Sequence, residues 1–426
     1  MRVCVLGAGV VGLSTAWALS EAGCEVVIAD GAARAGQGAS FGNGAQLSYN
    51  FVAPLASPDT LRHLPALLLD QNGPLRIKPR LDPAFLRWGL AFLRACTTRA
   101  ARETTAAQLL LAGLSRAELD RVQAATSFGF SRAEAGKLVV YRDQASFAAA
   151  IRQVEAQRAL GTSQQILNAA ESLAQEPGLR IRRDELEGGV FTPSEEVGDC
   201  AAYCDGLAST LRARNSVSWQ MGSALQPVLR GRELVAVRAG DEEITADRFV
   251  LCLGHGSAGF AEACGFHLPI QAMKGYSLTL RPNSDAAMLR HSVTDADRKV
   301  VFAPLHREDG PMIRVAGIAE MIGDDRRIDP ARLAMVRAHA DAALDVDQSS
   351  DPQGWAGLRP ATPDSRPVIG ASPVRDLWLN TGHGALGWTL ACGSARLLAD
   401  LILGLPPAIS GQLFAWNRSS APFSNV

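Results

Sequence analysis

The sequence predicts a protein of two domains: an α/β domain on a parallel sheet, and an α+β domain on a mostly antiparallel sheet. Three observations support this. The chain has 426 residues, well beyond one typical domain. Its first thirty residues read as strand, glycine-rich loop, helix and strand. Short segments of alternating polarity fill residues 217–253 and 271–317, as in antiparallel sheets.

The N-terminal unit comes first. Arg2–Gly7 is an apolar run typical of a buried parallel strand, and Val10–Ala22 has helical periodicity and ends before Gly23. Glu25–Asp30 is the second strand of this unit. Further along we expect helices at 83–96, 104–125, 146–160, 329–344 and 388–403, and strands at 136–141, 187–193, 217–221, 225–230, 233–239, 242–253, 271–280, 300–304, 312–317 and 378–381. We expect Asp199 to cap an alanine-rich helix, and the group from 217 to 253 to be antiparallel.

The loop of the first unit has the pattern G-x-G-x-x-G at Gly7, Gly9 and Gly12. The first glycine allows a tight turn, the second lets a pyrophosphate approach the backbone, and the third lets helix and strand pack closely. Val10 and Val11 lie in the first helical turn, where free N–H groups attract phosphate. Asp30 can accept hydrogen bonds from ribose hydroxyls and would repel the 2′-phosphate of NADP. The alternative is a tight turn without a ligand.

Both NAD and FAD use such a unit. FAD is favoured because the unit opens a long chain, and because 247–254, with its turn at Gly254, looks like a strand returning to the same sheet. We therefore expect a Rossmann-like FAD-binding domain formed by residues 1–57, 195–262 and 352–426. Residues 58–194 and 263–351 would form an inserted substrate-binding domain.

Two more glycine-rich segments could contact a flavin ring. The loop with Ser40, Asn43, Gly44, Ala45 and Gln46 has short side chains and two amides, so it could lie against a planar ring; the alternative is a flexible connection. The second segment opens the helix at 388–403, and its N–H groups could stabilise negative charge on the reduced ring. Its candidate residues are Gly382, His383, Gly384, Gly387, Trp388 and Thr389. His383 could donate a hydrogen bond or accept a proton; the alternative is a solvated turn.

Arg359 stands in an apolar, proline-rich strand. A buried arginine needs a carboxylate or phosphate, so Arg359 is either a clamp for a substrate carboxylate or an ion-pair partner of Asp364. Tyr276 lies in the strand at 271–280 and could reach the same pocket, or could be a structural tyrosine.

Composition limits the kinds of binding partner that we expect. The net charge is -1, from 42 basic and 43 acidic residues, which gives no reason to expect nucleic acid. The eight cysteines form no C-x-x-C pair, so no metal site is expected. The start lacks the features of a signal peptide, and no uncharged apolar run is long enough to span a bilayer, so we expect a cytoplasmic protein. The apolar runs 64–69 and 85–93 leave peripheral contact with the inner face of the cell membrane as an alternative, and an oligomer stays open.

Several segments together resemble the D-amino acid dehydrogenase small-subunit family, within the wider group of D-amino acid oxidase, glycine oxidase and sarcosine oxidase. The resemblance covers nearly the whole chain. The segments are Val3–Trp17, Asn43–Gln46, Ala53–Pro54, Gly198–Cys200, Lys274–Thr279, Gly357–Pro360 and Leu379–Ser394. The chain departs from the family pattern at Phe41, Gly42 and Tyr49, which puts the substrate in doubt.

The resemblance implies an FAD enzyme that deaminates D-amino acids oxidatively to 2-oxo acids and ammonia. Hydride would pass from the substrate Cα to flavin N5, and electrons would go on to a quinone or another respiratory acceptor. It also implies that Arg359 binds the carboxylate and that Tyr276 lines the pocket. Three alternatives remain: an oxidase that makes peroxide, a dehydrogenase or oxidase of secondary amino acids such as D-proline, hydroxyproline or N-substituted glycine, and a flavin-bound subunit without turnover.

Overall fold

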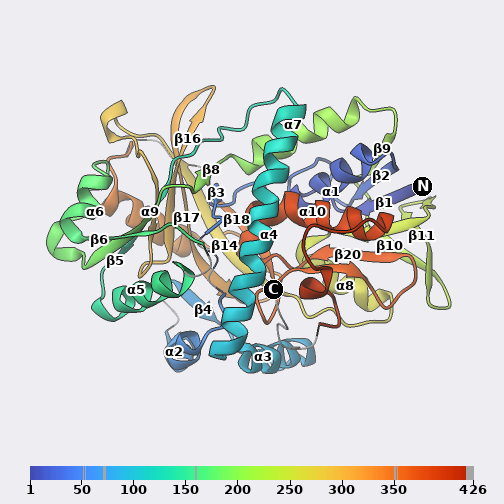
Figure 1. Ribbon diagram of the computed structural model, residues 1–426, viewed down its shortest axis with the longest axis horizontal. Helices are drawn as coiled ribbons and strands as arrows, with labels where there is room; N and C mark the ends of the chain where they lie inside the picture. Colours follow the sequence, from blue (N-terminus) through green and yellow to red (C-terminus); the bar gives the residue numbers. More distant parts are fainter. Residues whose placement is uncertain are drawn as a thin grey trace.

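A computed structural model describes residues 1–50, 52, 54–70, 73–158, 161–349, 352 and 354–418 (Figure 1). The side chains of residues 63 and 65–69 are also outside the described part. Two large sheets organise the described chain, one of six strands and one of nine.

The six-stranded sheet contains the N-terminal unit. Its order is β19 (Val368–Ala371), β20 (Leu377–Thr381), β13 (Arg248–Leu251), β1 (Arg2–Leu6), β2 (Glu25–Asp30) and β9 (Val217–Met221). All neighbours are parallel except β19 and β20. The expected return of the 247–254 segment to this sheet is confirmed. The expectation that the group from 217 to 253 is antiparallel is wrong for β9 and β13, because β9 pairs with β2, and β13 with β1 and β20, in parallel.

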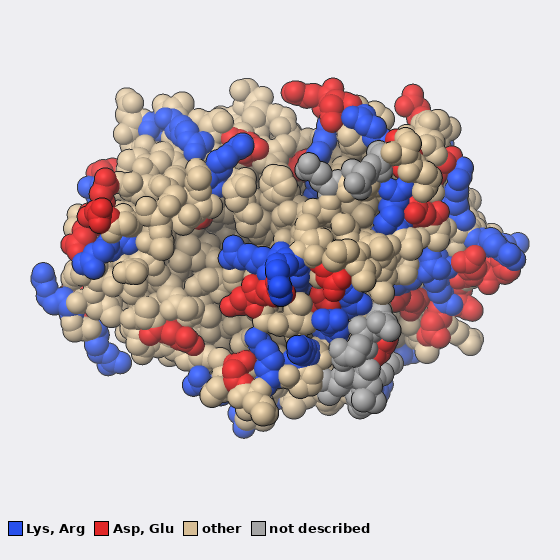
Figure 2. All heavy atoms as spheres, turned by 180° about the vertical axis from the view of Figure 1, so that it is seen from behind, with Lys and Arg blue, Asp and Glu red and all other residues tan. Residues whose placement is uncertain are grey.

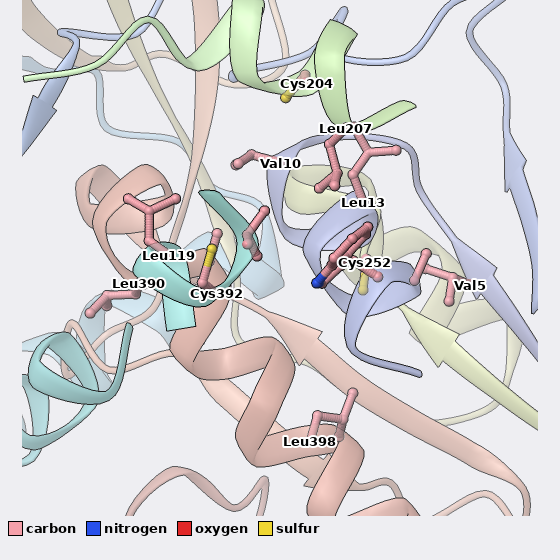
Figure 3. Close-up of a cluster of buried hydrophobic side chains, with 14 of the residues drawn as sticks. Val5, Val10, Leu13, Leu119, Cys204, Leu207, Cys252, Leu390, Cys392 and Leu398 are labelled. Atoms are coloured by element: carbon pink, nitrogen blue, oxygen red, sulfur yellow. The ribbon is translucent and has the colours of Figure 1, made fainter. Parts of the chain in front are cut away.

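Both faces of this sheet are buried, since alternate side chains of a strand point to opposite faces. Val3 and Val5 face a core shared by helices α1 (Val10–Glu21), α4 (Thr98–Ala125), α7 (Cys200–Arg212) and α10 (Gly387–Leu403), as Figure 3 shows. Cys4 and Leu6 face α8 (Ser257–Ala263) and the small sheet of β10 (Leu225–Arg230), β11 (Glu233–Ala239) and β12 (Glu242–Ile244).

The nine-stranded sheet is mostly antiparallel. Its order is β18 (Trp355–Ala361), β14 (Gln271–Leu280), β17 (Gly310–Met321), β16 (Val300–Arg307), β15 (Ser292–Asp295), β5 (Lys137–Tyr141), β7 (Gly188–Thr192) and β6 (Gln165–Asn168), with β4 (Leu75–Ile77) beside β17. Helix α9 (Pro330–Ala343) packs on one face of this sheet, where Val336 and Ala340 join the core.

The remaining elements lie around and between the sheets. Helices α2 (Pro58–Leu69) and α3 (Pro83–Ala95) lie together at the lower edge in Figure 1, and α4 runs between the two sheets. Helices α5 (Gln144–Arg158) and α6 (Ala169–Gln175) cover the outer end of the large sheet, and β3 (Gln46–Leu47) pairs with β8 (Glu196–Val197).

The predicted fold class is confirmed: a parallel sheet with helices is joined to a mostly antiparallel sheet. Two expected boundaries are wrong. Strand β18 was expected in the FAD-binding domain, but it pairs with β14 in the nine-stranded sheet. Helix α4 was expected in the inserted domain, but Leu111 and Leu119 pack in the core of the six-stranded sheet. The rest of the proposed division stays a prediction.

Figure 2 shows basic and acidic side chains interspersed over one face, in keeping with the net charge of -1. One helix in the described chain, residues 384–403, is long and apolar enough to cross a membrane, but 67% of its most apolar window is buried against other elements.

Candidate active site

The glycines of the first loop have the geometry that a phosphate site needs. Gly7 has φ +117°, and a Cβ there would lie 2.7 Å from the carbonyl carbon of Cys252. A Cβ on Gly12 would lie 2.8 Å from the carbonyl carbon of Gly7, so helix and loop touch there. A Cβ on Gly9 would meet only Ser40 Oγ, at 3.4 Å. Gly7 and Gly12 are therefore required by the chain itself, whereas Gly9 leaves space above the loop.

Asp30 is fixed beside this loop. Its carboxylate accepts N–H from Ala8 at 2.6 Å and from Ala32 at 2.7 Å. A carboxylate has about four lone-pair sites, so two remain for ribose hydroxyls. Ser40 Oγ accepts the N–H of Val10 at 3.0 Å, so this side chain ties its loop to the first turn of α1, and the expected contact of Ser40 with the ring stays a prediction.

The loop from Asn43 to Gln46 lies against the nine-stranded sheet. Asn43 accepts a hydrogen bond on its carbonyl from Arg314 Nη1 at 2.9 Å, and Gln46 Nε2 donates to Thr294 Oγ1 at 3.2 Å. A Cβ on Gly44 would lie 3.0 Å from Val301 Cγ2. Ala45 has φ +55°, so the loop is held in one shape rather than being a flexible connection. Ala53, which follows this region in the family resemblance, lies outside the described residues.

The second glycine turn connects β20 to α10. Gly382 has φ +79° and packs so closely on Thr362 that a Cβ would lie 2.6 Å from its Cγ2. Trp388 does not offer its ring to a ligand. Its Nε1 donates to the Gly198 carbonyl at 3.0 Å, and its ring packs 4.7 Å from that of Tyr203. The side chain of Trp388 therefore has structural contacts, and the contact of this turn with a flavin stays a prediction.

Three other residues of this segment are placed as follows. Gly384 has φ +55° and starts the short turn that ends at Gly387, where α10 begins. Thr389 Oγ1 accepts the N–H of Ser48 at 3.0 Å, which ties α10 to the chain that follows Gln46. Gly254 accepts a hydrogen bond on its carbonyl from Thr381 Oγ1 at 3.2 Å, so the turn after β13 meets the end of β20.

His383 is not placed to act as a base. Its side chain is buried, and Nε2 lies 3.1 Å from Ser394 Oγ, which in turn donates to the Ala391 carbonyl. Burial lowers the pKa of His383 to about 3. The imidazole is therefore neutral near pH 7, and the expected role in proton transfer is not supported by its surroundings.

Tyr276 lies on the face of its strand opposite to Arg359, because successive side chains of a strand face opposite sides. Its hydroxyl donates to Glu320 Oε2 at 2.7 Å, and Glu320 also accepts from Arg332 Nε at 2.8 Å. The ring belongs to the core beneath α9. Burial and the neighbouring Glu320 carboxylate raise its pKa. These contacts are structural, and a pocket shared by Tyr276 and Arg359 stays a prediction.

Arg359 lies on the other face. In the antiparallel pair of β18 and β14 it is opposite Met273, so both point away from Tyr276. Burial lowers the pKa of the guanidinium, and among the described residues no group accepts a hydrogen bond from it. Asp364, the alternative partner, instead pairs with Arg418 at 2.8 Å and Arg366 at 3.1 Å.

The face that carries Arg359 also meets the loop and the turn. Ser277, on the same face, donates to the Gly42 carbonyl at 2.6 Å, and β18 contacts both short turns, Gly254–Gly256 and Gly384–Leu386. This face of the sheet therefore meets the loop at Gly42, and strand β18 meets the turns that begin at Gly254 and Gly384. Sequence reasoning missed Ser277 and Trp355, which are directly opposite each other in this pair of strands. No signal within either strand identifies them, because only the pairing of β14 with β18 puts them on the face of Arg359.

Comparison with known proteins agrees with this geometry. The family model described as FAD dependent oxidoreductase matches residues 2–401.

The chain belongs to the FAD-dependent oxidoreductase family.

Curated relatives of this oxidoreductase extend over its full length. It is 45% identical to D-amino acid dehydrogenase 2 of Ralstonia nicotianae, over 98% of this chain and 100% of that protein. It is 42% identical to D-amino acid dehydrogenase 2 of Pseudomonas aeruginosa, over 96% of each. Among solved structures it is similar to glycine oxidase from Geobacillus kaustophilus, with a TM-score of 0.75 and 18% identity over 99% of this chain and 100% of that one. The last similarity shows the shared fold.

The residues of the oxidoreductase fit its family's cofactor. The space above Gly9, the position of Asp30 and the start of α1 beyond Val10 suit the ADP half of FAD. The loop from Asn43 and the start of α10 are the segments that could hold the ring. The described residues contain no group of three or more His, Cys, Asp or Glu that could hold a metal ion.

Proposed function

We propose that this oxidoreductase oxidises D-amino acids to 2-oxo acids and ammonia and passes the electrons to a quinone or another respiratory acceptor. The support comes from two sources. Full-length relatives at 45% and 42% identity are named D-amino acid dehydrogenases. The candidate site also holds a cation suited to a carboxylate.

The observation that carries the proposal is the guanidinium of Arg359. Its side chain is partly buried, and no described carboxylate pairs with it. Leaving a charge in such a place costs free energy that a bound anion recovers. Arginine binds a carboxylate through two parallel hydrogen bonds, which fixes orientation as well as position. An α-amino acid supplies that carboxylate.

The reaction balances with a small set of groups. The substrate loses two electrons, its Cα hydrogen and an amine proton to become an imine, and water then converts the imine to a 2-oxo acid and ammonia. FAD, when bound, would take up the two electrons together with the Cα hydrogen, as a hydride. Arg359 fixes the carboxylate so that Cα stays in one place, and such positioning is worth several kcal/mol. With His383 neutral and buried, we infer that the amine proton passes to water.

An anaerobic titration of the purified holoenzyme tests the proposal. The flavin absorbance near its longest-wavelength band would be followed with matched D- and L-amino acids, D-proline, hydroxyproline and N-methylglycine. We expect bleaching by primary D-amino acids at lower concentrations than by their L-enantiomers. Bleaching by the secondary amines alone would replace the proposed substrate class, and no bleaching by any of them would favour a subunit without turnover.

The acceptor is tested separately. Under air, peroxide formation would be compared with reduction of a soluble quinone at the same D-amino acid concentration. A dehydrogenase reduces the quinone much faster than it makes peroxide. Equal rates would make the protein an oxidase.

Contact with an anionic membrane surface is part of the same proposal. On α3, Leu86, Leu90 and Leu93 are 54%, 50% and 42% exposed, while Trp88 and Phe92 are buried on the opposite side. Their spacing places the three leucines on one stripe of the helix. Leu81, just before α3, is 95% exposed. The side chains of the other apolar run, 65–69, lie outside the described residues.

The charge around this stripe suits anionic lipid. Residues 58–103 carry eight basic and four acidic side chains in a chain of net charge -1. The basic ones are Arg62, Arg76, Lys78, Arg80, Arg87, Arg94, Arg99 and Arg102. An apolar stripe with flanking basic residues binds at the interface of anionic bilayers. This would bring the enzyme to membrane quinones.

Sedimentation with lipid vesicles tests this contact. We expect the holoenzyme to sediment with phosphatidylglycerol vesicles and much less with phosphatidylcholine, and the variant Leu86→Gln/Leu90→Gln to lose binding. Leu229→Gln is the matched control, since Leu229 is a 37% exposed leucine of β10. Equal binding by both variants would refute the contact.

A further inference from the structure

Two glycines face each other under the Arg359 side chain. Gly275 of β14 is directly opposite Gly357 of β18, between the pairs Met273–Arg359 and Ser277–Trp355. Directly opposite residues of an antiparallel pair point to the same face, so these two positions form a floor without Cβ atoms. The floor lies on the face that carries the candidate carboxylate clamp.

The two large side chains of β18 lie over this floor. A Cβ on Gly275 would overlap the end of the Arg359 side chain, with its Cζ at 2.7 Å and its Nε at 3.2 Å. A Cβ on Gly357 would enter the indole of Trp355, with Cζ3 at 2.9 Å. The guanidinium therefore lies across Gly275, and the indole lies across Gly357 beside it.

The backbone does not require glycine at 275. The register of β14 against β17 shifts between Lys274 and Tyr276, which marks a β-bulge. Gly275 nevertheless lies outside the left-handed region, unlike Gly7 or Gly382, so an L-residue can adopt its conformation. The atoms that a Cβ would meet belong to the end of a flexible side chain and not to the backbone. An alanine here would displace the guanidinium and leave the strands in place.

We propose that Gly275 is a positioning residue for the substrate carboxylate: it holds no ligand itself, and it keeps the guanidinium of Arg359 flat against the sheet. This inference rests on the proposed function of Arg359. The affinity of the site for a carboxylate then depends on the lack of a Cβ atom at position 275. Gly275→Ala then changes binding while the fold stays intact.

The test uses the holoenzyme and two probes of similar shape, the anion propanoate and the neutral propanamide. Their binding is measured from the shift of the flavin spectrum, which needs no turnover. Gly275→Ala is compared with Gly113→Ala, whose added Cβ in α4 meets nothing within 4 Å. We expect Gly275→Ala to weaken propanoate binding at least tenfold, to leave propanamide binding within about twofold, and to keep FAD content and melting temperature. We expect no change in Gly113→Ala.

The double variant Gly275→Ala/Arg359→Met shows whether the effect acts through Arg359. If it does, the alanine adds nothing once the guanidinium is gone. Unchanged propanoate affinity in Gly275→Ala, equal loss for both probes, an additive double variant, or a clearly lower melting temperature would each overturn the inference. The proposed function fails on a different result, the absence of flavin reduction by D-amino acids in the wild type. In that case the binding of propanoate and propanamide, read from the flavin spectrum, still decides the role of Gly275.

Discussion

Replacing Arg359 with methionine separates a residue that serves the substrate from one that serves the fold. Methionine keeps much of the side-chain length and removes the charge and all five N–H donors. The side chain is partly buried, burial lowers the pKa of the guanidinium, and no described group accepts its hydrogen bonds. Arg359→Met therefore removes from the free protein a partly buried charge that has no partner among the described residues, and it removes a clamp from the substrate complex.

The two effects have opposite signs. A bidentate pair comprises two charge-assisted hydrogen bonds of about 1.5–3 kcal/mol each. Their joint loss, about 3–6 kcal/mol, predicts that kcat/KM for a D-amino acid falls about 100- to 20,000-fold. Removal of the unpaired charge predicts an unchanged or higher free energy of unfolding, by up to about 1 kcal/mol.

The assay is dye reduction by a D-amino acid over a concentration series, alongside thermal unfolding of the same samples. Arg366→Met is the control, because Arg366 pairs with Asp364. We expect the control to lose stability and to keep its kcat/KM. A loss below tenfold in Arg359→Met, about 1.4 kcal/mol, would refute the clamp. A large loss of stability in Arg359→Met would show that the guanidinium has a partner within the protein.

Three other predictions follow from the residues around the site. Tyr276→Phe leaves a buried Glu320 carboxylate with one donor fewer, so we expect a loss of about 1–3 kcal/mol in unfolding free energy with little change in KM; a raised KM would return Tyr276 to the pocket. The pKa of His383 is lowered to about 3, so the unfolded chain binds more protons than the folded chain between about pH 3 and 6.5, and stability falls as pH falls through that window. We expect His383→Gln to reduce this fall in melting temperature and to leave the pH profile of kcat/KM above pH 6 unchanged. A shifted profile would restore His383 as the base. Asp364 has its pKa lowered to about 2 beside Arg418, so its stabilisation of about 2 kcal/mol is present above pH 4 and lost as pH falls toward 2; a melting temperature of Asp364→Asn equal to that of the wild type at pH 7 would contradict this.

Local patterns predicted the cofactor half of the molecule well. The spacing of the glycines predicts that Gly7 and Gly12 have no room for a side chain and that Gly9 leaves space for a ligand, and the structure has this arrangement. The position of Asp30 beside the loop is predicted by its place at the end of the second strand. Asp199 caps α7 through the N–H groups of Ala201 and Ala202, as its position before an alanine-rich helix predicts. These features depend on neighbours in the sequence, so a single segment determines them.

The substrate half depended on pairings that no single segment contains. Tyr276 and Ser277 are adjacent in the chain, and only the pairing of β14 with β18 shows that Ser277 shares the face of Arg359. Trp388 and His383 belong to a glycine-rich turn that looks exposed, and the packing of α10 buries both. Strand β18 was assigned to the wrong sheet for the same reason, since periodicity does not identify a strand's partner.

The central claim is that Arg359 receives the substrate carboxylate on the sheet face shared with Gly275 and Ser277. A crystal structure of the holoenzyme with a bound, unreactive carboxylate analogue of a D-amino acid measures this directly. We expect both carboxylate oxygens about 2.7–2.9 Å from Arg359 nitrogens. A carboxylate bound elsewhere, for example at Arg314, with the Arg359 guanidinium left unpaired, would contradict the account.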